Sequence, residues 1–343
     1  MMAPVPPLFD PDGNKYDQAT YRGRLLHFLD VIDPRMLLVG DEQLKESQAR
    51  ITRFRQFRHH QGVDSGGSDA ELWQAKKVQD ALLHPDTGEK ILLPLRMSAF
   101  VPVGIIFVLG MLRPNPSLRS AIFWQWANQS SNATINYANR NATADETDGS
   151  AAVRTMFESY CVAVAGSCGI AFGATKALGS ARAKLLPPKL RSTLSLFVPL
   201  VSVCSANSFS LCVIRRRELT NGIELTDESG EAVGHSKIAA RKAMTEMVLS
   251  RGMLLPSTVL GIPPVIMAVL DRICRWSPTS KARLGAQVVT VVGALGVMLP
   301  LALAVFPQKG SLARAALEPQ FRNSKGSTSG ENHSALLYYN KGL

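Results

Sequence analysis

Hydrophobic and polar positions are strongly segregated along this chain. Six windows of 16 to 25 residues contain no Asp, Glu, Lys or Arg: residues 97–112, 120–139, 159–175, 192–214, 252–270 and 284–308. A helix needs roughly 20 apolar residues to cross the hydrocarbon core of a bilayer, with a range of about 17 to 25. Because the bilayer interior offers no water to backbone N–H and C=O groups, the windows predict helices rather than strands.

The pattern predicts an all-α polytopic membrane protein with about five to six transmembrane or re-entrant helices. We expect residues 1–92 to form a polar N-terminal region with short helices, 93–308 the transmembrane bundle, and 309–343 a polar C-terminal tail. A small extramembrane hairpin is predicted in the loop at about 215–250, where Asn221-Gly222 and Ser229-Gly230 are turn signals. A large soluble fold would instead need each of the windows to be a buried core helix.

Two helices of the N-terminal region carry clear boundary signals. Asp33-Pro34 ends the first helix, and Ser68 with Glu71 forms a capping box that begins the second. After the second helix, the stretch from His84 to Lys90 combines a proline, a glycine and opposite charges, which predicts a tight turn. His84 and Asp86 could relay protons, but a structural turn or gate fits their position before the membrane better.

Prolines interrupt several of the apolar windows, at positions 102, 199, 256, 263, 264 and 300. A proline inside a helix removes a hydrogen bond and clashes with the preceding turn. Broken helices expose backbone polar groups that line substrate cavities in transporters. The alternative is that membrane helices simply tolerate the prolines, as they often do.

The second window is unusual because it is rich in amides. On a helix five of its side-chain amides fall in one stripe, since their spacing is three or four residues: Gln125, Asn128, Asn132, Asn136 and Asn139. Gln129 is a further candidate substrate-binding residue. Such a stripe offers hydrogen-bond donors and acceptors without a fixed charge. It predicts a binding site for a zwitterionic or carboxylate substrate, with Arg140 as the anion partner. The competing interpretation is that the amides bond neighbouring helices.

A second polar island lies in the fourth window, at Ser202, Ser205, Asn207, Ser208 and Ser210. Asn207 is its candidate substrate-binding residue, and a structural contact between helices is an almost equal interpretation.

Charge and motifs narrow the possible partners. The net charge is +11, but the Lys and Arg residues lie at window ends and in loops, which suits anionic lipid headgroups better than nucleic acid. The five cysteines lack CxxC spacing and a nearby histidine, so no metal and no cofactor are expected. Walker A, HExxH and Ser-His-Asp signatures are missing from the sequence, so we expect no enzyme activity.

Several local motifs resemble the sideroflexin family over nearly the whole chain, from Tyr21 to the C-terminus. The matching stretches are Gly23-Arg24, His27-Phe28, Asp33-Pro34-Arg35, Leu72–Lys77, His84–Lys90, Arg96-Met97-Ser98, Trp124–Ser130, Asn136-Tyr137, Asn139-Arg140, Ser205-Ala206-Asn207 and Phe306-Pro307-Gln308. Asn139–Thr143 and Tyr339–Leu343 are most similar to the fifth branch of that family.

The resemblance implies a multi-pass protein of the mitochondrial inner membrane that transports small polar metabolites. Members of the family are associated with amino acids such as serine, and the fifth branch with citrate and related tricarboxylates. The alternative that the family offers is a non-transporting scaffold that assists respiratory complex assembly. Family members are usually drawn with about five spans. Ser210 stands where relatives tend to have a second asparagine, which bears on substrate selectivity.

Overall fold

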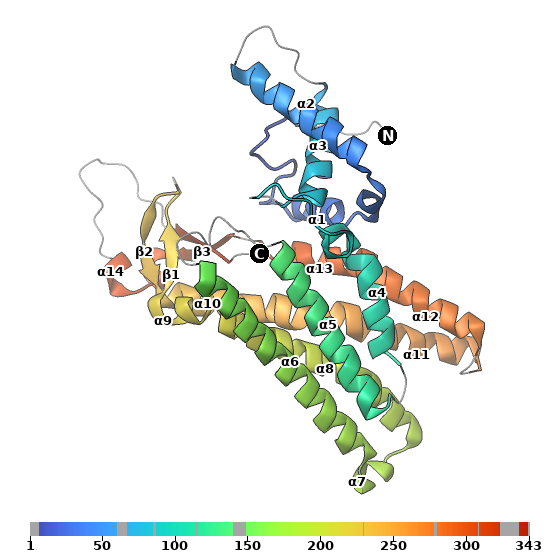
Figure 1. Cartoon of the computed structure of the whole chain (residues 1–343). Coiled ribbons are helices and arrows are strands. Elements are labelled where there is room, and N and C mark those ends of the chain that lie inside the picture. The colour runs from blue at the N-terminus through green and yellow to red at the C-terminus, as the bar shows by residue number, and fades with distance from the viewer. Residues whose placement is uncertain are drawn as a thin grey trace. The chain divides into compact units, whose positions relative to one another are not determined.

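The structure is a computed structural model and describes residues 7–59, 67–84, 87–113, 116–139, 149–228, 230–277, 280–307, 309–322 and 336–341 (Figure 1). The chain divides into two compact units. Unit 1 comprises Met1–Arg113, Ala127–Val153 and Ile262–Val305, and unit 2 comprises Pro114–Trp126, Arg154–Gly261 and Phe306–Leu343. Helix α5 (Leu118–Ala138) contributes residues to both units, and each unit is described by itself.

The polar N-terminal region of unit 1 is helical, as the sequence predicts. Its elements are α1 (Tyr21–Val31), η1 (Pro34–Leu38), α2 (Asp41–His59), α3 (Asp69–Leu82), η2 (Leu93–Leu95) and η3 (Met97–Ala99). The predicted capping box at α3 is confirmed, because the Ser68 hydroxyl accepts from the backbone of Glu71 and the Glu71 carboxylate accepts from the backbone of Ser68. Helix α1 ends before Asp33, whose carboxylate caps η1.

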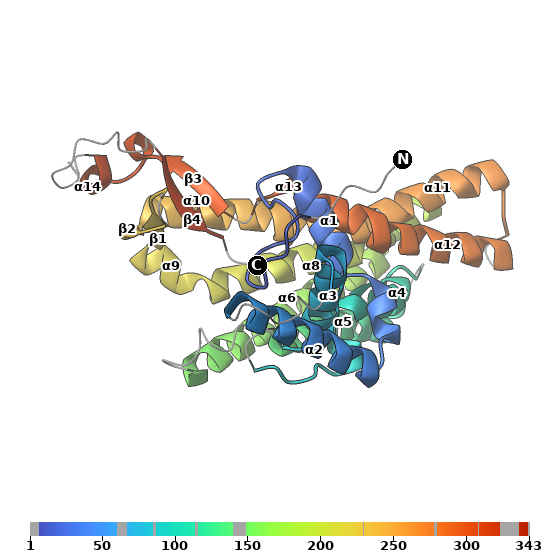
Figure 2. The ribbon, with the colours of Figure 1, turned by 90° about the horizontal axis from the view of Figure 1, so that it is seen from above.

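The apolar helices of unit 1 are α4 (Phe100–Met111), α11 (Ile262–Cys274), α12 (Lys281–Gly293), η7 (Ala294–Met298) and α13 (Leu299–Val305). Figure 2 shows α11 and α12 side by side, and an ion pair between Arg283 and Asp271 closes their turn. The N-terminal region is anchored to the end of α13. The Arg24 guanidinium, buried on α1, donates to the Ala304 carbonyl at 2.8 Å, where a helix C-terminus favours a positive charge.

Unit 2 contains two long antiparallel helices and a small sheet. Its helices are α6 (Gly149–Gly179), the short α7 (Ala181–Lys184), α8 (Pro188–Ile214), α9 (Arg216–Asn221), α10 (Lys237–Met247), η5 (Val248–Leu254) and η6 (Ser257–Gly261). The Glu158 carboxylate, near the start of α6, pairs with Arg216 just beyond the end of α8 at 2.7 Å. The ion pair therefore fixes the antiparallel arrangement of α6 and α8.

Among the described residues, four helical segments are long and apolar enough to cross a membrane: Val153–Gly179, Pro188–Ile214, Lys237–Cys274 and Lys281–Val305. The segment Met97–Met111 is apolar but shorter. Helix α5 has 21 residues, but its many amide and hydroxyl side chains make it less apolar than the four. All six windows are helical, and the predicted all-α polytopic membrane fold is confirmed.

Several of the prolines predicted to break helices follow π-helical turns. The π-helix η5 ends two residues before Pro256, η6 ends two residues before Pro263, and η7 ends two residues before Pro300. A proline ring clashes with the carbonyl one turn earlier, and a wider turn relieves that clash. The helices continue past these prolines rather than stopping at them.

The predicted hairpin belongs to a larger sheet. Strands β1 (Ile223–Thr226) and β2 (Ala232–Ser236) pair as expected, and β3 (Lys309–Ala313) and β4 (Leu336–Asn340) extend them in the order β2-β1-β4-β3. The sheet packs on α10 through a core that includes Leu225, Leu337 and Tyr339. The segment described from the sequence only as a polar tail therefore supplies two strands, one of them central.

Candidate functional site

The amide stripe predicted from the sequence forms one face of α5. Gln125 of the stripe and the further candidate Gln129 are deeply buried, because their side chains are only 1% and 4% exposed. They lie one helical turn apart and therefore on the same side of the helix. Asn128 and Asn132 are half-buried on that face, and Asn136 is exposed. Burial is therefore greatest at Gln125 and Gln129 and least at Asn136.

The buried glutamines carry polar atoms that nothing in the described residues satisfies. Gln125 Oε1 and Gln129 Nε2 are both fully buried and have no hydrogen-bond partner. Leaving a buried donor or acceptor unpaired costs about 1–3 kcal/mol. Each amide group offers a donor and an acceptor, so the pair can bind a solute that has both.

The side-chain amide of Asn139, at the end of the stripe, forms structural hydrogen bonds to the backbone. Its Nδ2 donates to the Leu95 carbonyl at 2.9 Å and to the Ile135 carbonyl at 2.8 Å. Both amide hydrogens are therefore used, and only the carbonyl oxygen of Asn139 can face a ligand. Arg140 and Asp86, two further site candidates, lie outside the described residues.

Asn207 lies on α8 and contacts the π-helix η5. Its Nδ2 donates to the Arg251 carbonyl at 3.4 Å, which gives a partner to a backbone acceptor of the widened turn. Gly252 permits this close approach, since a Cβ at that position would lie 2.6 Å from the Ser208 hydroxyl. The amide nitrogen of Asn207 thus has a structural role, and its carbonyl oxygen has no bond among those the structure describes.

Arg251 is a candidate functional residue that the amide stripe and the polar island did not indicate. It is the single charged residue of the chain between Glu246 and Asp271, in a helical segment apolar enough to cross a membrane. Ionisable residues within membrane segments are rare and usually functional, and π-helical turns are frequent at functional sites. The signal was available in the sequence, because Arg251 marks the edge of an uncharged window.

His84 lies in a tight turn, as predicted. Its backbone N–H donates to the Glu89 carbonyl at 2.8 Å, and its carbonyl accepts from Gly88 at 3.0 Å. The imidazole is buried, and its Nδ1 accepts from the Thr87 backbone at 3.3 Å. Gly88 adopts a φ of 67°, a left-handed conformation that glycine reaches without strain. These contacts are those of a structural turn.

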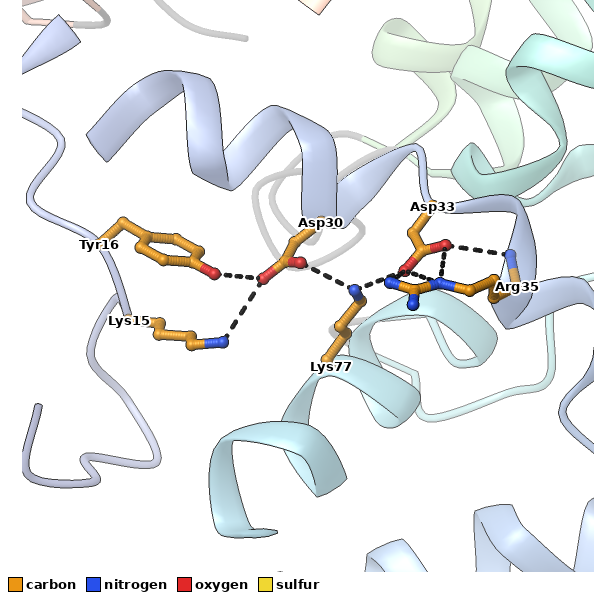
Figure 3. Close-up of polar contacts among 6 residues, drawn as sticks. All are labelled: Lys15, Tyr16, Asp30, Asp33, Arg35 and Lys77. Carbon is orange, nitrogen blue, oxygen red and sulfur yellow. Dashed lines mark hydrogen bonds and ion pairs between the residues drawn. The ribbon is translucent and has the colours of Figure 1, made fainter. Parts of the chain in front are cut away.

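The densest charge network of the described N-terminal region is centred on Lys77 (Figure 3). Lys77 Nζ lies 2.8 Å from Asp30 Oδ1 and 2.7 Å from Asp33 Oδ2, so one ammonium joins α3 to both ends of the α1–η1 junction. Arg35 also binds Asp33, and its hydrogen bond holds the pKa of that carboxyl well below the usual range. Burial and a hydrogen bond to Asp30 raise the pKa of Tyr16 to about 12.

No set of three or more His, Cys, Asp or Glu side chains within the described ranges is arranged to hold a metal ion. The fold defines a multi-pass helical membrane protein, and α5 carries buried amide side chains.

Comparison with known proteins gives the family. The sideroflexin family model matches residues 10–343. Sideroflexin-5 of Caenorhabditis elegans is 40% identical, over 99% of this chain and 97% of the relative. Sideroflexin-5 of Homo sapiens is 37% identical over 98% and 94%, and Sideroflexin-3 of Mus musculus 39% over 96% of each. No solved structure matches the chain. The chain therefore belongs to the sideroflexin family.

Proposed function

We propose that this protein transports small polar metabolites across the mitochondrial inner membrane, with amino acids such as serine or tricarboxylates such as citrate as substrates. The family resemblance supports both the location and the substrate class. The four apolar helices and the amide face of α5 support a path for polar solutes. Asn128, Asn132 and Asn207 are further candidates to line this path.

The unsatisfied pair of buried glutamines carries the proposal. A helix whose only task is to pack against other helices gains nothing from unpaired polar atoms at Gln125 and Gln129, since each costs free energy. A bound solute with hydroxyl, ammonium or carboxylate groups would satisfy both atoms and recover that cost. The same reasoning explains why the face carries amides rather than fixed charges, which are more expensive to bury.

Uptake into proteoliposomes tests the proposal. The purified protein should accumulate labelled serine or citrate, and the double variant Gln125→Leu, Gln129→Leu should lose at least about tenfold in uptake, as expected from two lost hydrogen bonds. Thr134→Ala is the matched control, because Thr134 is exposed on the opposite face of α5. Failure of the wild-type protein to transport serine, citrate or related metabolites would overturn the proposal.

A rescue experiment in cells distinguishes a transport function from a scaffold role in respiratory complex assembly. Cells that lack the protein should not be rescued by a variant with Asn132→Leu and Asn136→Leu if transport is the function, because both changes remove amides from the stripe on α5. Full rescue by this variant, at normal protein levels and without uptake, would favour the scaffold.

A further inference from the structure

The turn between α6 and α8 is placed by the fold at a membrane surface. It comprises residues 180–187 and includes the short helix α7. The helices on either side, Val153–Gly179 and Pro188–Ile214, are both long and apolar enough to cross a bilayer. Within unit 2, Figure 1 shows α7 at the end of α6 and α8 that is remote from the sheet. A turn this short between two spanning helices has to lie where the hydrocarbon core ends.

Positive charge is concentrated at this turn without compensation. No acidic residue occurs in the chain between Glu158 and Glu218, whereas five basic residues lie at the turn: Lys176, Arg182, Lys184, Lys189 and Arg191. We call residues 176–191 the basic turn. The side chains of Lys176, Arg182 and Lys189 are exposed. They are available to an anionic partner.

The opposite end of the same helices has a different charge balance. Residues 215–250 contain six basic residues and six acidic ones. Some of these pair with each other, as Arg215 does with Glu218 at 2.8 Å and Arg216 with Glu158 at 2.7 Å. The excess of positive charge is therefore a property of the basic turn and not of every loop in unit 2.

Apolar side chains accompany the charges at the basic turn. Leu185 is 87% exposed and Leu190 is 45% exposed, so both present hydrocarbon beside the basic groups. Lys176 Nζ lies 4.8 Å from the centroid of the exposed Phe172 ring, in a cation–π contact. Membrane surfaces are bound by this combination, in which leucine and phenylalanine enter the acyl boundary and lysine and arginine meet the headgroups.

We propose that the basic turn is a binding site for the anionic headgroups of phospholipids in the adjacent leaflet. Exposed leucines favour a lipid over a free phosphate ion, because an ion offers them no hydrocarbon to contact. Each Lys or Arg near an anionic surface strengthens the attraction, and the effect extends over about a Debye length. Bound anionic lipid would hold the α6–α8 pair in register with the membrane surface.

Thermal unfolding in nanodiscs of defined composition tests this site. The full-length protein should melt at a higher temperature in phosphatidylcholine discs that also contain phosphatidylglycerol than in phosphatidylcholine alone. The variant with Lys176→Gln, Arg182→Gln and Lys189→Gln should lose at least half of that rise. The matched control is Arg217→Gln, Lys237→Gln and Arg241→Gln, which removes three exposed charges from the opposite end of unit 2 and should keep the rise.

The wild-type protein and both triple variants should melt at the same temperature in phosphatidylcholine discs, which shows that the variants fold. If the basic-turn triple variant does not fold, the single variant Lys189→Gln replaces it in the test. The proposal is overturned if the wild-type protein gains nothing from phosphatidylglycerol or if the control loses as much as the basic-turn variant. It is also overturned if inorganic phosphate reproduces the rise in phosphatidylcholine discs. None of these readouts depends on transport.

Discussion

Lys77 shows how one buried charge can organise a region of polar composition. Its side chain is 13% exposed and lies between two carboxylates, of which Asp33 is 6% exposed. The N-terminal region is poor in apolar residues for its length. A polar contact that joins α1, η1 and α3 therefore accounts for a larger share of its stability than it would in an apolar core.

Replacing Lys77 with methionine should destabilise the N-terminal region by about 3 kcal/mol. Methionine keeps most of the side-chain volume but leaves Asp30 and Asp33 without their ammonium partner, and removing one member of a buried pair is strongly destabilising. Hydrogen exchange of α1 and α3 amides measures the change. Lys45→Met, at an exposed position on α2, is the control and should have little effect. Equal exchange in the two variants would show that the network contributes little.

Ionisation of Tyr16 should weaken the same network at alkaline pH. A tyrosine hydroxyl has a pKa near 10 in an unfolded chain, and burial with the hydrogen bond to Asp30 raises the pKa of Tyr16 to about 12. Its contribution to stability is therefore complete below about pH 10 and is lost as the pH rises toward 12. Local exchange of α1 should accelerate over this interval. Tyr16→Phe should remove the acceleration in α1, and its persistence in that variant would assign the step to another group.

Arg251 tests whether a charge within the apolar segment takes part in transport. If the substrate carries a carboxylate, Arg251→Gln should reduce uptake about tenfold or more and Arg251→Lys should retain part of it, because the attraction is electrostatic. The protein level and melting temperature of both variants give the control for folding. Uptake unchanged in Arg251→Gln would indicate that the side chain only extends to the membrane surface.

At the scale of elements, β4 is the strand on which the extramembrane sheet depends. It pairs with β1 on one side and β3 on the other, and alternate residues of it are buried. Tyr339 packs so closely on β3 that a Cβ at Gly310 would lie 2.3 Å from its ring. Lys341, directly after the strand, pairs with Glu246 of α10 at 2.6 Å.

Adjacent leucines of β4 allow a matched comparison. Leu337→Ala should destabilise unit 2 by about 3 kcal/mol, since Leu337 is fully buried and its loss leaves a cavity. Leu336→Ala should cost less than about 1 kcal/mol, because Leu336 is on the other face and 40% exposed. Hydrogen exchange of β1 and β2 amides distinguishes them. Similar protection in both variants would mean that β4 is not integral to the sheet.

The helices and the hairpin could be predicted because their signals are local. Charge-free windows, the capping box at Ser68 and the turn signal at Ser229-Gly230 each depend on residues that are close together in the chain. The strands β3 and β4 could not be predicted in this way. Strand β4 pairs with β1, which lies more than 100 residues earlier in the chain, and β3 pairs with β4. The pattern of each strand is too short to indicate a strand without its partner.

The same distinction between local signals and tertiary contacts applies to the residues of the candidate site. The stripe on α5 followed from helical spacing alone, and the structure places Gln125 of that stripe in a buried position. The use of Asn139 to bind the Leu95 carbonyl and of Asn207 to bind the Arg251 carbonyl depends on neighbouring elements. Spacing identifies which amides share a face, but only tertiary contacts show which of them are already engaged.

At the scale of the whole molecule, contacts within each unit constrain how the chain crosses the membrane. In unit 1 the hydrogen bond between Asn139 and Leu95 brings the end of α5 close to the start of α4. Helix α4 therefore begins on the same side of the membrane on which α5 ends. In unit 2 the sheet joins β1, which follows α8, to β4, which follows α13. An even number of crossings has to separate these strands, and the segments Lys237–Cys274 and Lys281–Val305 supply two.

Positive charge is concentrated at three of the turns that follow apolar helices. Eleven of the 38 Lys and Arg residues lie at the turns after α4, α6 and α11: Arg113, Arg119, Lys176, Arg182, Lys184, Lys189, Arg191, Arg272, Arg275, Lys281 and Arg283. Only Asp271 of the 27 acidic residues accompanies them. By the positive-inside rule, we predict that these turns stay on the side from which the helices insert.

Cysteine labelling from one side of sealed vesicles tests this arrangement. In proteins that each keep a single cysteine, with every other cysteine replaced by alanine, the exposed native Cys274 at the end of α11 should react with an impermeant maleimide from the same side as an Ala181→Cys variant. An Ala315→Cys variant, placed after β3, should react only from the opposite side. Detergent should make all three reactive, which controls for burial. If Cys274 and the residue-315 variant react from the same side, an even number of crossings separates them. That result would exclude Lys281–Val305 as the single complete span between them.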